Sequence, residues 1–137
     1  LSQYDYVVDC IDTVAAKLDL VERCITLQVP ILSAMGSGNK LDPTAFRVTD
    51  LSKTQGCPLA RVMRKELRKR GITHLKVVYS TEEPLTPLQP AEEEAPAGTD
   101  TRPRSTARRA TPGSISFVPA AAGLVAASAV IRDLGGF

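Results

Sequence analysis

The chain has 137 residues, the size of one domain or of part of a larger one. Its 17 Lys and Arg residues nearly balance its 15 Asp and Glu residues, which leaves a net charge of +2. This balance excludes a nucleic-acid binder that is basic over its whole surface, so any basic site must be local. The three cysteines include no CxxC pair, which argues against a zinc ribbon or a redox dithiol and fits a reducing, cytoplasmic setting.

The first third of the chain predicts two strands of a parallel sheet with a helix between them. Residues 6–11 read as a largely apolar strand, residues 14–27 as a helix and residues 31–35 as a second buried strand. This spacing predicts a βαβ unit. The apolar face of the helix is expected to consist of Val14, Leu18, Val21 and Ile25, with Lys17, Glu22 and Arg23 facing outward.

Two carboxylates lie near the end of the first strand. Asp9 is inside the strand, where a charge is costly to desolvate, and we expect a buried side chain bonded to backbone amides. Asp12 stands at the strand's exit, the edge at which open α/β sheets bind ligands. Position alone leaves two interpretations of Asp12 open: a cap of the following helix, or a carboxylate that holds Mg²⁺ on the phosphates of a nucleotide.

The middle of the chain predicts two more strands and a second helix. GSGN at 36–39 is interpreted as a tight connection rather than a phosphate-binding loop, because a lone GxG is a weak signal. Residues 46–51 read as a half-exposed strand, residues 58–70 as a helix from a proline to a glycine stop, and residues 75–80 as a further strand. The expected buried side of this helix consists of Leu59, Val62, Met63 and Leu67.

The helix at 58–70 concentrates positive charge, with six Lys or Arg residues against the single acid Glu66. Such a face can grip the phosphates of RNA or an acidic protein. A solvated face with cations near the helix's carboxyl end is favoured instead, because no aromatic residue is interleaved for base stacking. The candidate nucleic-acid-binding residues are Arg61, Arg64, Lys65, Arg68 and Lys69.

Cys57 comes directly before that helix, where a helix amino terminus stabilises a thiolate. It is therefore a candidate nucleophile. The chain's single histidine, His74, lies beyond the helix, so an ordinary exposed thiol is the favoured interpretation. Cys10 and Cys24 lie on apolar segments and are expected to be buried free thiols.

The last third of the chain changes character twice. Residues 82–112 hold six prolines and separate acidic and basic halves, which is typical of a loop or linker. Pro119 interrupts the uncharged run at 114–131, so we expect a final strand and a core helix at 113–137 rather than a membrane span. Residues 1–81 and 113–137 are thus predicted to form one α/β domain, a Rossmann-like mixed sheet with helices on both faces.

Four stretches of the chain together resemble a known family. DYVVDCIDTVAAKLDLVERC, VPILSAMGSGNKLDPTAFRVTDLSKT, PLARVMRKELRKRGI and GSISFVPAAAGLVAASAVIRDL are similar, in this order, to the carboxyl-terminal half of ThiF/MoeB/HesA-type enzymes, the bacterial relatives of ubiquitin-activating enzymes. Within that group the likeness is greatest to the tRNA threonylcarbamoyladenosine dehydratase branch. Because the chain starts at Leu1 within a turn and strand, we expect it to be the carboxyl-terminal portion of such a protein.

The resemblance implies ATP-dependent adenylation. ATP activates a carboxylate as an acyl-adenylate, and a nucleophile then displaces AMP. In the dehydratase branch the carboxylate belongs to the threonylcarbamoyl group on a tRNA adenosine, and its own nitrogen closes a ring. Asp12 matches the aspartate that closes the family's D-x-x-D strand end, near the ATP phosphates and Mg²⁺. Lys17 matches a basic position to which we assign no role.

The resemblance also has implications for partners. Family members generally form homodimers, and the basic helix becomes a candidate tRNA contact. Adenylation of a ubiquitin-like or sulfur-carrier protein is an alternative, which the lack of CxxC pairs disfavours. A non-catalytic Rossmann-like binding module is another. The family's glycine-rich nucleotide loop belongs to its first half, so we expect this chain alone to be inactive.

Overall fold

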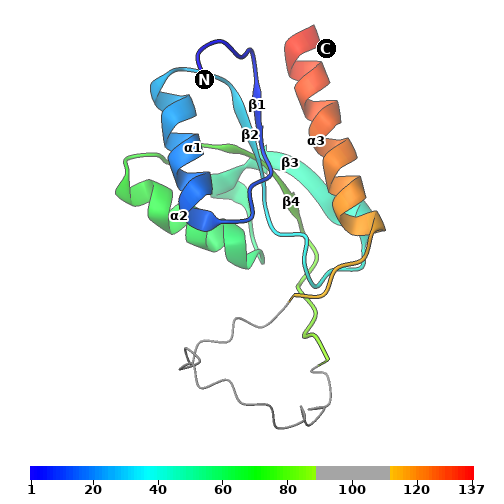
Figure 1. The fold of residues 1–137 in the computed structure, drawn as a ribbon. Helices are drawn as coiled ribbons and strands as arrows, with labels where there is room; N and C mark the ends of the chain where they lie inside the picture. Colours follow the sequence, from blue (N-terminus) through cyan, green and yellow to red (C-terminus); the bar gives the residue numbers. More distant parts are fainter. Residues whose placement is uncertain (89–111) are drawn as a thin grey trace, which may run out of the picture.

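A four-stranded mixed sheet organises the computed structural model, which describes residues 1–88 and 112–137 (Figure 1). The strands lie in the order β1-β2-β4-β3. β1 is parallel to β2 and β2 to β4, whereas β3 is antiparallel to β4. The predicted mixed α/β sheet is therefore confirmed. The strands are β1 (Val7–Asp9), β2 (Ile31–Ala34), β3 (Phe46–Asp50) and β4 (Lys76–Ser80).

Helices cover both faces of this sheet, as expected. Figure 1 shows α1 (Val14–Thr26) and α2 (Pro58–Lys69) on one side and α3 (Phe117–Gly135) on the other. Successive side chains of a strand point to opposite faces, so Val77 packs towards α1 and α2 while Val78 packs towards α3. Two short 3-10 turns, η1 (Pro43–Ala45) and η2 (Leu51–Lys53), flank β3.

The buried faces of α1 and α2 differ from the predicted ones at several positions. Leu18, Val21 and Cys24 of α1 are buried, but so is Lys17, which was expected to face outward, whereas Ile25 is partly exposed. Lys17 points inward because its ammonium pairs with the buried carboxylate of Asp9 in β1. On α2 the buried residues are Ala60, Met63 and Leu67, and Val62 is exposed, contrary to the prediction.

The predicted strand at the start of the last segment is wrong. Residues 112–115 have no regular structure, and α3 begins at Phe117. Pro119 does not interrupt the run, because it falls in the first turn of a helix, where the amide it lacks has no partner within the helix. The prediction that residues 82–112 form a linker falls largely on residues 89–111, which lie outside the described residues.

α3 is also not the core helix that was expected. Val118, Ala126 and Ala129 are buried against β2, β3 and β4, whereas Leu124 and Ile131 are exposed. Among the described residues, α3 is the one helix whose length and mean hydropathy of 1.5 would suit a membrane span, and only 17% of that stretch is buried. Composition alone is weak evidence for such a span.

The predicted exposure is confirmed for one of the three cysteines and wrong for the other two. Cys24 is buried, as expected. Cys10 is exposed, because it follows the last residue of β1, and Cys57 is buried rather than exposed. All three are free thiols.

Candidate functional site

A cavity of about 580 Å³ opens at the carboxyl ends of β1 and β2. Its walls come from residues 10–12 after β1, residues 34–40 at the end of β2 and beyond, the first turn of α2, the amino-terminal half of α3, Pro84 and residues 112–114. Polar side chains and free backbone groups gather at this edge in open α/β sheets, because the loops that follow parallel strands meet there. This cavity is therefore the candidate ligand site.

Asp12 lies on this cavity, in the bend between β1 and α1. Its side chain is exposed, and the N-cap of α1 is Thr13. Within the described part of the chain no hydrogen bond engages the Asp12 carboxylate, so the interpretation of Asp12 as a helix cap finds no support in the geometry. The carboxylate is available to a ligand.

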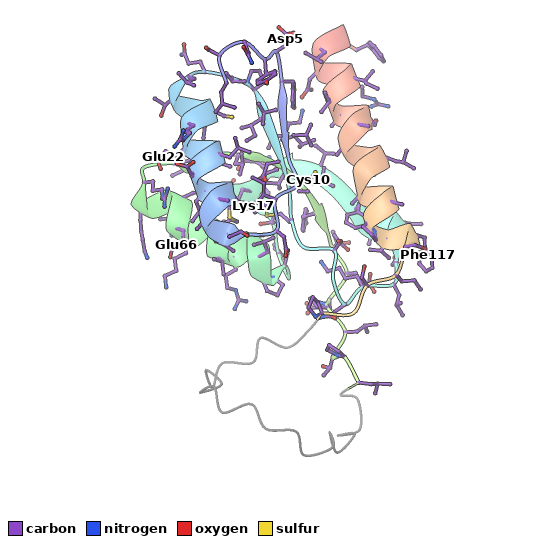
Figure 2. The ribbon with its side chains drawn as sticks, viewed as in Figure 1. Asp5, Cys10, Lys17, Glu22, Glu66 and Phe117 are labelled. Atoms are coloured by element: carbon purple, nitrogen blue, oxygen red, sulfur yellow. The ribbon has the colours of Figure 1, made fainter. Side chains whose placement is uncertain are left out.

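Asp9 of β1 and Lys17 of α1, which is labelled in Figure 2, form a buried ion pair. Lys17 Nζ lies 2.9 Å from Asp9 Oδ2, and the Ser33 hydroxyl donates to the same oxygen at 2.5 Å. The other oxygen, Oδ1, accepts the Ile11 amide at 3.0 Å, which confirms the expected bond to a backbone amide. Asp9 therefore fixes the backbone next to Asp12.

The partners of Asp9 were missed from the sequence, although two signals pointed to them. A serine inside an otherwise apolar strand needs a hydrogen-bond partner, and Ser33 is the residue of β2 paired with Asp9. Lys17 is the fourth residue of α1, which begins five residues after β1 ends. The position that the resemblance left without a role thus compensates a buried charge.

The loop at 36–40 is held against the segment that precedes α3. Asn39 adopts a positive φ of 60°, and its amide donates to the Gly113 carbonyl at 2.8 Å while its side chain accepts the Gly113 amide at 2.7 Å. A β-carbon at Gly38 would lie 3.1 Å from the Cβ atom of Pro112, so this close approach favours glycine. The loop is a wall of the cavity and not only a connection between strands.

Cys57 also lines the cavity, and no histidine of this chain lies beside it. It is the N-cap of α2 and almost fully buried. His74 is exposed on another loop, where its Nδ1 atom lies 3.4 Å from Asp50. Since that is the chain's single histidine, no imidazole lies beside the Cys57 thiol to act as its base.

The structure brings the five predicted basic residues of α2 onto one face of that helix, where they line a shallow depression. Arg64 is partly committed, because it donates to the backbone oxygen of Thr54 at 3.0 Å and to its hydroxyl. Lys69 is paired with Glu66 at 2.9 Å. Within α2, the exposed cations with no ion pair among the described residues are Arg61, Lys65 and Arg68.

The side chains that line the cavity suit a divalent cation that is held mainly by the phosphate oxygens of a bound nucleotide. Asp12 is the one carboxylate among the described residues that line the cavity. Those residues hold no cluster of three or more His, Cys, Asp or Glu side chains. Mg²⁺ commonly takes one or two carboxylates with phosphate oxygens and water, which this arrangement fits.

Comparisons with known proteins agree with the predicted resemblance. The ThiF family model matches residues 1–137. The chain is 39% identical to the tRNA threonylcarbamoyladenosine dehydratase of Bacillus subtilis, over 95% of this chain and 50% of that protein. It is 31% identical to the enzyme of the same name from Escherichia coli, over 96% of this chain and 52% of that protein.

Solved structures show the same likeness. The E. coli dehydratase TcdA in complex with ATP superimposes with a TM-score of 0.75 at 28% identity, over 97% of this chain and 49% of that chain. The chain thus spans about half the length of these relatives. Because the family model covers the chain from its first to its last residue, the protein belongs to the ThiF family.

Proposed function

We propose that this chain is the carboxyl-terminal part of an ATP-dependent adenylating enzyme of the tRNA threonylcarbamoyladenosine dehydratase type. The observation that carries the proposal is the exposed Asp12 carboxylate, which bonds to none of the described residues, on a cavity at the carboxyl ends of β1 and β2. The names of the relatives and the ATP complex of one of them support this choice among the reactions of the family.

The proposed reaction makes a poor electrophile reactive. A carboxylate oxygen of the threonylcarbamoyl group attacks the α-phosphorus of ATP, and pyrophosphate leaves. The substrate's own nitrogen then attacks the activated carbon, and AMP departs with the former carboxylate oxygen. The net result is loss of water and closure of a ring, at the expense of one phosphoanhydride bond.

Asp12 is the residue of this chain that would hold Mg²⁺ together with the ATP phosphates. When bound there, Mg²⁺ supplies neutralisation of the charge that develops on pyrophosphate. Asp9 acts one step removed, because its bond to the Ile11 amide holds the bend from which Asp12 projects. We assign Cys57 no step, since no histidine of this chain lies beside it.

The exposed cations of α2 are the proposed tRNA contact. Arg61, Lys65 and Arg68 present positive charge that the described part of the chain does not neutralise. They share no residue with the cavity, although the amino terminus of α2 reaches it, so tRNA phosphates and the reacting group would be held by different parts of one helix. Contacts to phosphates position a nucleic acid without reading its sequence.

Two further features of the intact protein belong to the proposal. We propose a homodimer that acts in the cytoplasm, as the family resemblance and the free cysteines suggest. Activation of a sulfur-carrier protein is not favoured, because the chain lacks the CxxC pairs with which such relatives hold zinc.

ATP–pyrophosphate exchange by the complete protein, with its RNA substrate, tests the proposal. Asp12→Ala should lower the exchange rate by about 100-fold, as loss of a group that stabilises transition-state charge commonly does. Asp5→Ala is the matched control, since Asp5 is an exposed acid outside the cavity. Near-normal exchange in the Asp12→Ala protein, or no exchange in the wild type, would contradict the proposed function.

A further inference from the structure

Lys40 is a buried ammonium on the wall of the candidate cavity. Only 3% of the residue is exposed, and it lines the cavity together with Gly36. Its Nζ atom donates to the Gly36 carbonyl at 3.2 Å, and none of the ion pairs in the described residues includes it. Because an ammonium carries three donors and a full charge, one long bond to a carbonyl leaves most of its capacity unused.

The first turn of α2 lies beside Gly36, whose carbonyl accepts the bond from Lys40. Cys57, Pro58 and Leu59 line the same cavity, and a β-carbon at Gly36 would lie 3.8 Å from the Cβ atom of Leu59. α2 is 12 residues long, and its N-cap makes no side-chain capping bond. The amides of its first turn therefore lack acceptors within the helix, and their partial positive charge points out of its amino terminus.

The charges of the cavity are arranged so that they do not cancel. Lys40 and Asp12 are the one base and the one acid among its described lining residues. They form no ion pair with each other within 4.0 Å. A buried ammonium that has no counter-charge among the described residues, on a cavity that also holds the amino terminus of a helix, is suited to an anion from outside.

We propose that Lys40 and the first turn of α2 form an oxyanion subsite of the cavity. The subsite binds a phosphate or carboxylate oxygen of the reactants, and this inference rests on the proposed function. Two reactant groups carry that chemistry: the polyphosphate of ATP and the carboxylate that ATP activates. Lys40 is then a binding residue of the cavity, separate from Asp12.

Direct binding measurements on the complete protein test the subsite. Lys40→Met removes the charge and keeps the length of the side chain, Lys40→Ala removes both, and Lys40→Arg restores the charge. Lys53→Met is the matched control, because Lys53 is an exposed lysine of η2 outside the cavity. Dissociation constants for ATP, AMP and inorganic pyrophosphate are measured by calorimetry, and the KM for the RNA substrate by turnover.

Two results support the subsite and distinguish its ligands. If Lys40 holds the polyphosphate, Lys40→Met weakens the binding of ATP and of pyrophosphate about tenfold and leaves the binding of AMP unchanged. Lys40→Arg, which keeps the charge, then binds ATP and pyrophosphate as the wild type does. If Lys40 holds the carboxylate, all three constants stay the same and the KM for the RNA substrate rises about tenfold. A tenfold change corresponds to about 1.4 kcal/mol, within the range of a charge-assisted hydrogen bond.

Two other results overturn it. In the first, neither Lys40→Met nor Lys40→Ala changes any dissociation constant or the KM. In the second, both variants weaken the binding of AMP as much as that of ATP, and Lys40→Arg does not restore binding, which indicates a structural role for Lys40. The pyrophosphate measurement separates this inference from the proposed function, because it requires no adenylation. Wild-type protein that binds pyrophosphate through Lys40 but catalyses no exchange keeps the subsite and loses the proposed reaction.

Discussion

Lys17 of α1 reaches Asp9 of β1 across 2.9 Å, and both side chains are almost completely buried. The two residues lie on consecutive elements of the βαβ unit, and the pair joins the helix to the strand at the point where the chain bends towards Asp12. The charges are compensated by each other, by the Ser33 hydroxyl and by the Ile11 amide. Loss of either partner leaves an uncompensated charge in the interior.

Lys17→Met should therefore destabilise the protein by about 3–5 kcal/mol, because the Asp9 carboxylate stays buried without its counter-charge. The double variant with Asp9→Asn as well should be less destabilised than Lys17→Met alone. Urea unfolding followed by circular dichroism measures both. Arg23→Ala is the control: it breaks the exposed pair with Asp19 and should cost about 0.5 kcal/mol or less. A loss below about 1 kcal/mol in Lys17→Met contradicts the assigned role.

A second prediction concerns the basic face of α2. Combined alanine substitution of Arg61, Lys65 and Arg68 should weaken tRNA binding by the complete protein at low salt and reduce the slope of log affinity against log salt, because phosphate contacts release counterions. Arg64 is left intact, since its bonds to Thr54 tie α2 to the segment after η2. Filter binding at several salt concentrations gives both quantities.

The matched control for that experiment replaces three exposed cations on other elements, Arg23, Lys53 and Arg132. The net charge falls equally in the two triple variants, so a difference between them reports the position of the charge. Equal affinity in both variants would remove the basic face from the RNA interface and leave a general charge effect.

A third prediction concerns the reactivity of the three cysteines and can be tested on this 137-residue chain. Cys10 should react rapidly with an aromatic disulfide reagent in the native state, because its side chain is exposed. Cys24 and Cys57 should react after unfolding, since both are buried and since burial raises the pKa of the Cys24 thiol. One equivalent before and three after denaturant is the expected count. Native reaction of Cys57 would reopen the question of its role in the cavity.

The elements whose ends carry a local sequence signal could be predicted, as helix α2 shows. Pro58 at the start of α2 and Gly71 after it, which adopts a φ of 74°, bracket that helix in the sequence as they do in the structure. The start of α3 could not be predicted the same way. An uncharged run of Ala and Val suits a buried strand and a helix alike, and the first-turn position of Pro119 shows only once the helix boundary is known.

In the candidate site, too, the residues with a local sequence signal could be predicted, whereas those placed by long-range contacts could not. Asp12 was predicted as a site residue from its place after the first strand, and the structure puts it on the cavity, three residues after β1 ends. Lys17 was assigned to the wrong face, because its position is decided by Asp9 and Ser33 and not by the apolar period of its own helix. The wall that carries Lys40 depends on the bonds between Asn39 and Gly113, which lie 74 residues apart. Contacts of that range leave no periodic signal.

The attachment of α3 to the sheet gives a final prediction. Asp133 near the end of α3 accepts a hydrogen bond from Lys76 Nζ at 2.6 Å and from the Tyr6 hydroxyl at 2.8 Å. The bond from Lys76, followed by that from Tyr6, lowers the pKa of Asp133 below its ordinary value of 3.8. Burial, reinforced by the same carboxylate, raises the pKa of Tyr6, so the phenol stays a donor throughout the acid and neutral range.

A carboxyl group whose pKa is lowered in the folded state stabilises that state once the unfolded chain is ionised, above pH 3.8, and the gain disappears as the pH falls through the lowered value. The Tm of the wild type should therefore exceed that of Asp133→Asn at pH 6, and the difference should shrink as the pH falls below 3.8. Thermal unfolding at a series of pH values measures it. Other carboxylates of the chain lose stabilisation in the same range, so the comparison with Asp133→Asn isolates this one. A constant difference between pH 6 and pH 2.5 would mean that the Asp133 charge contributes nothing to holding α3 on the sheet.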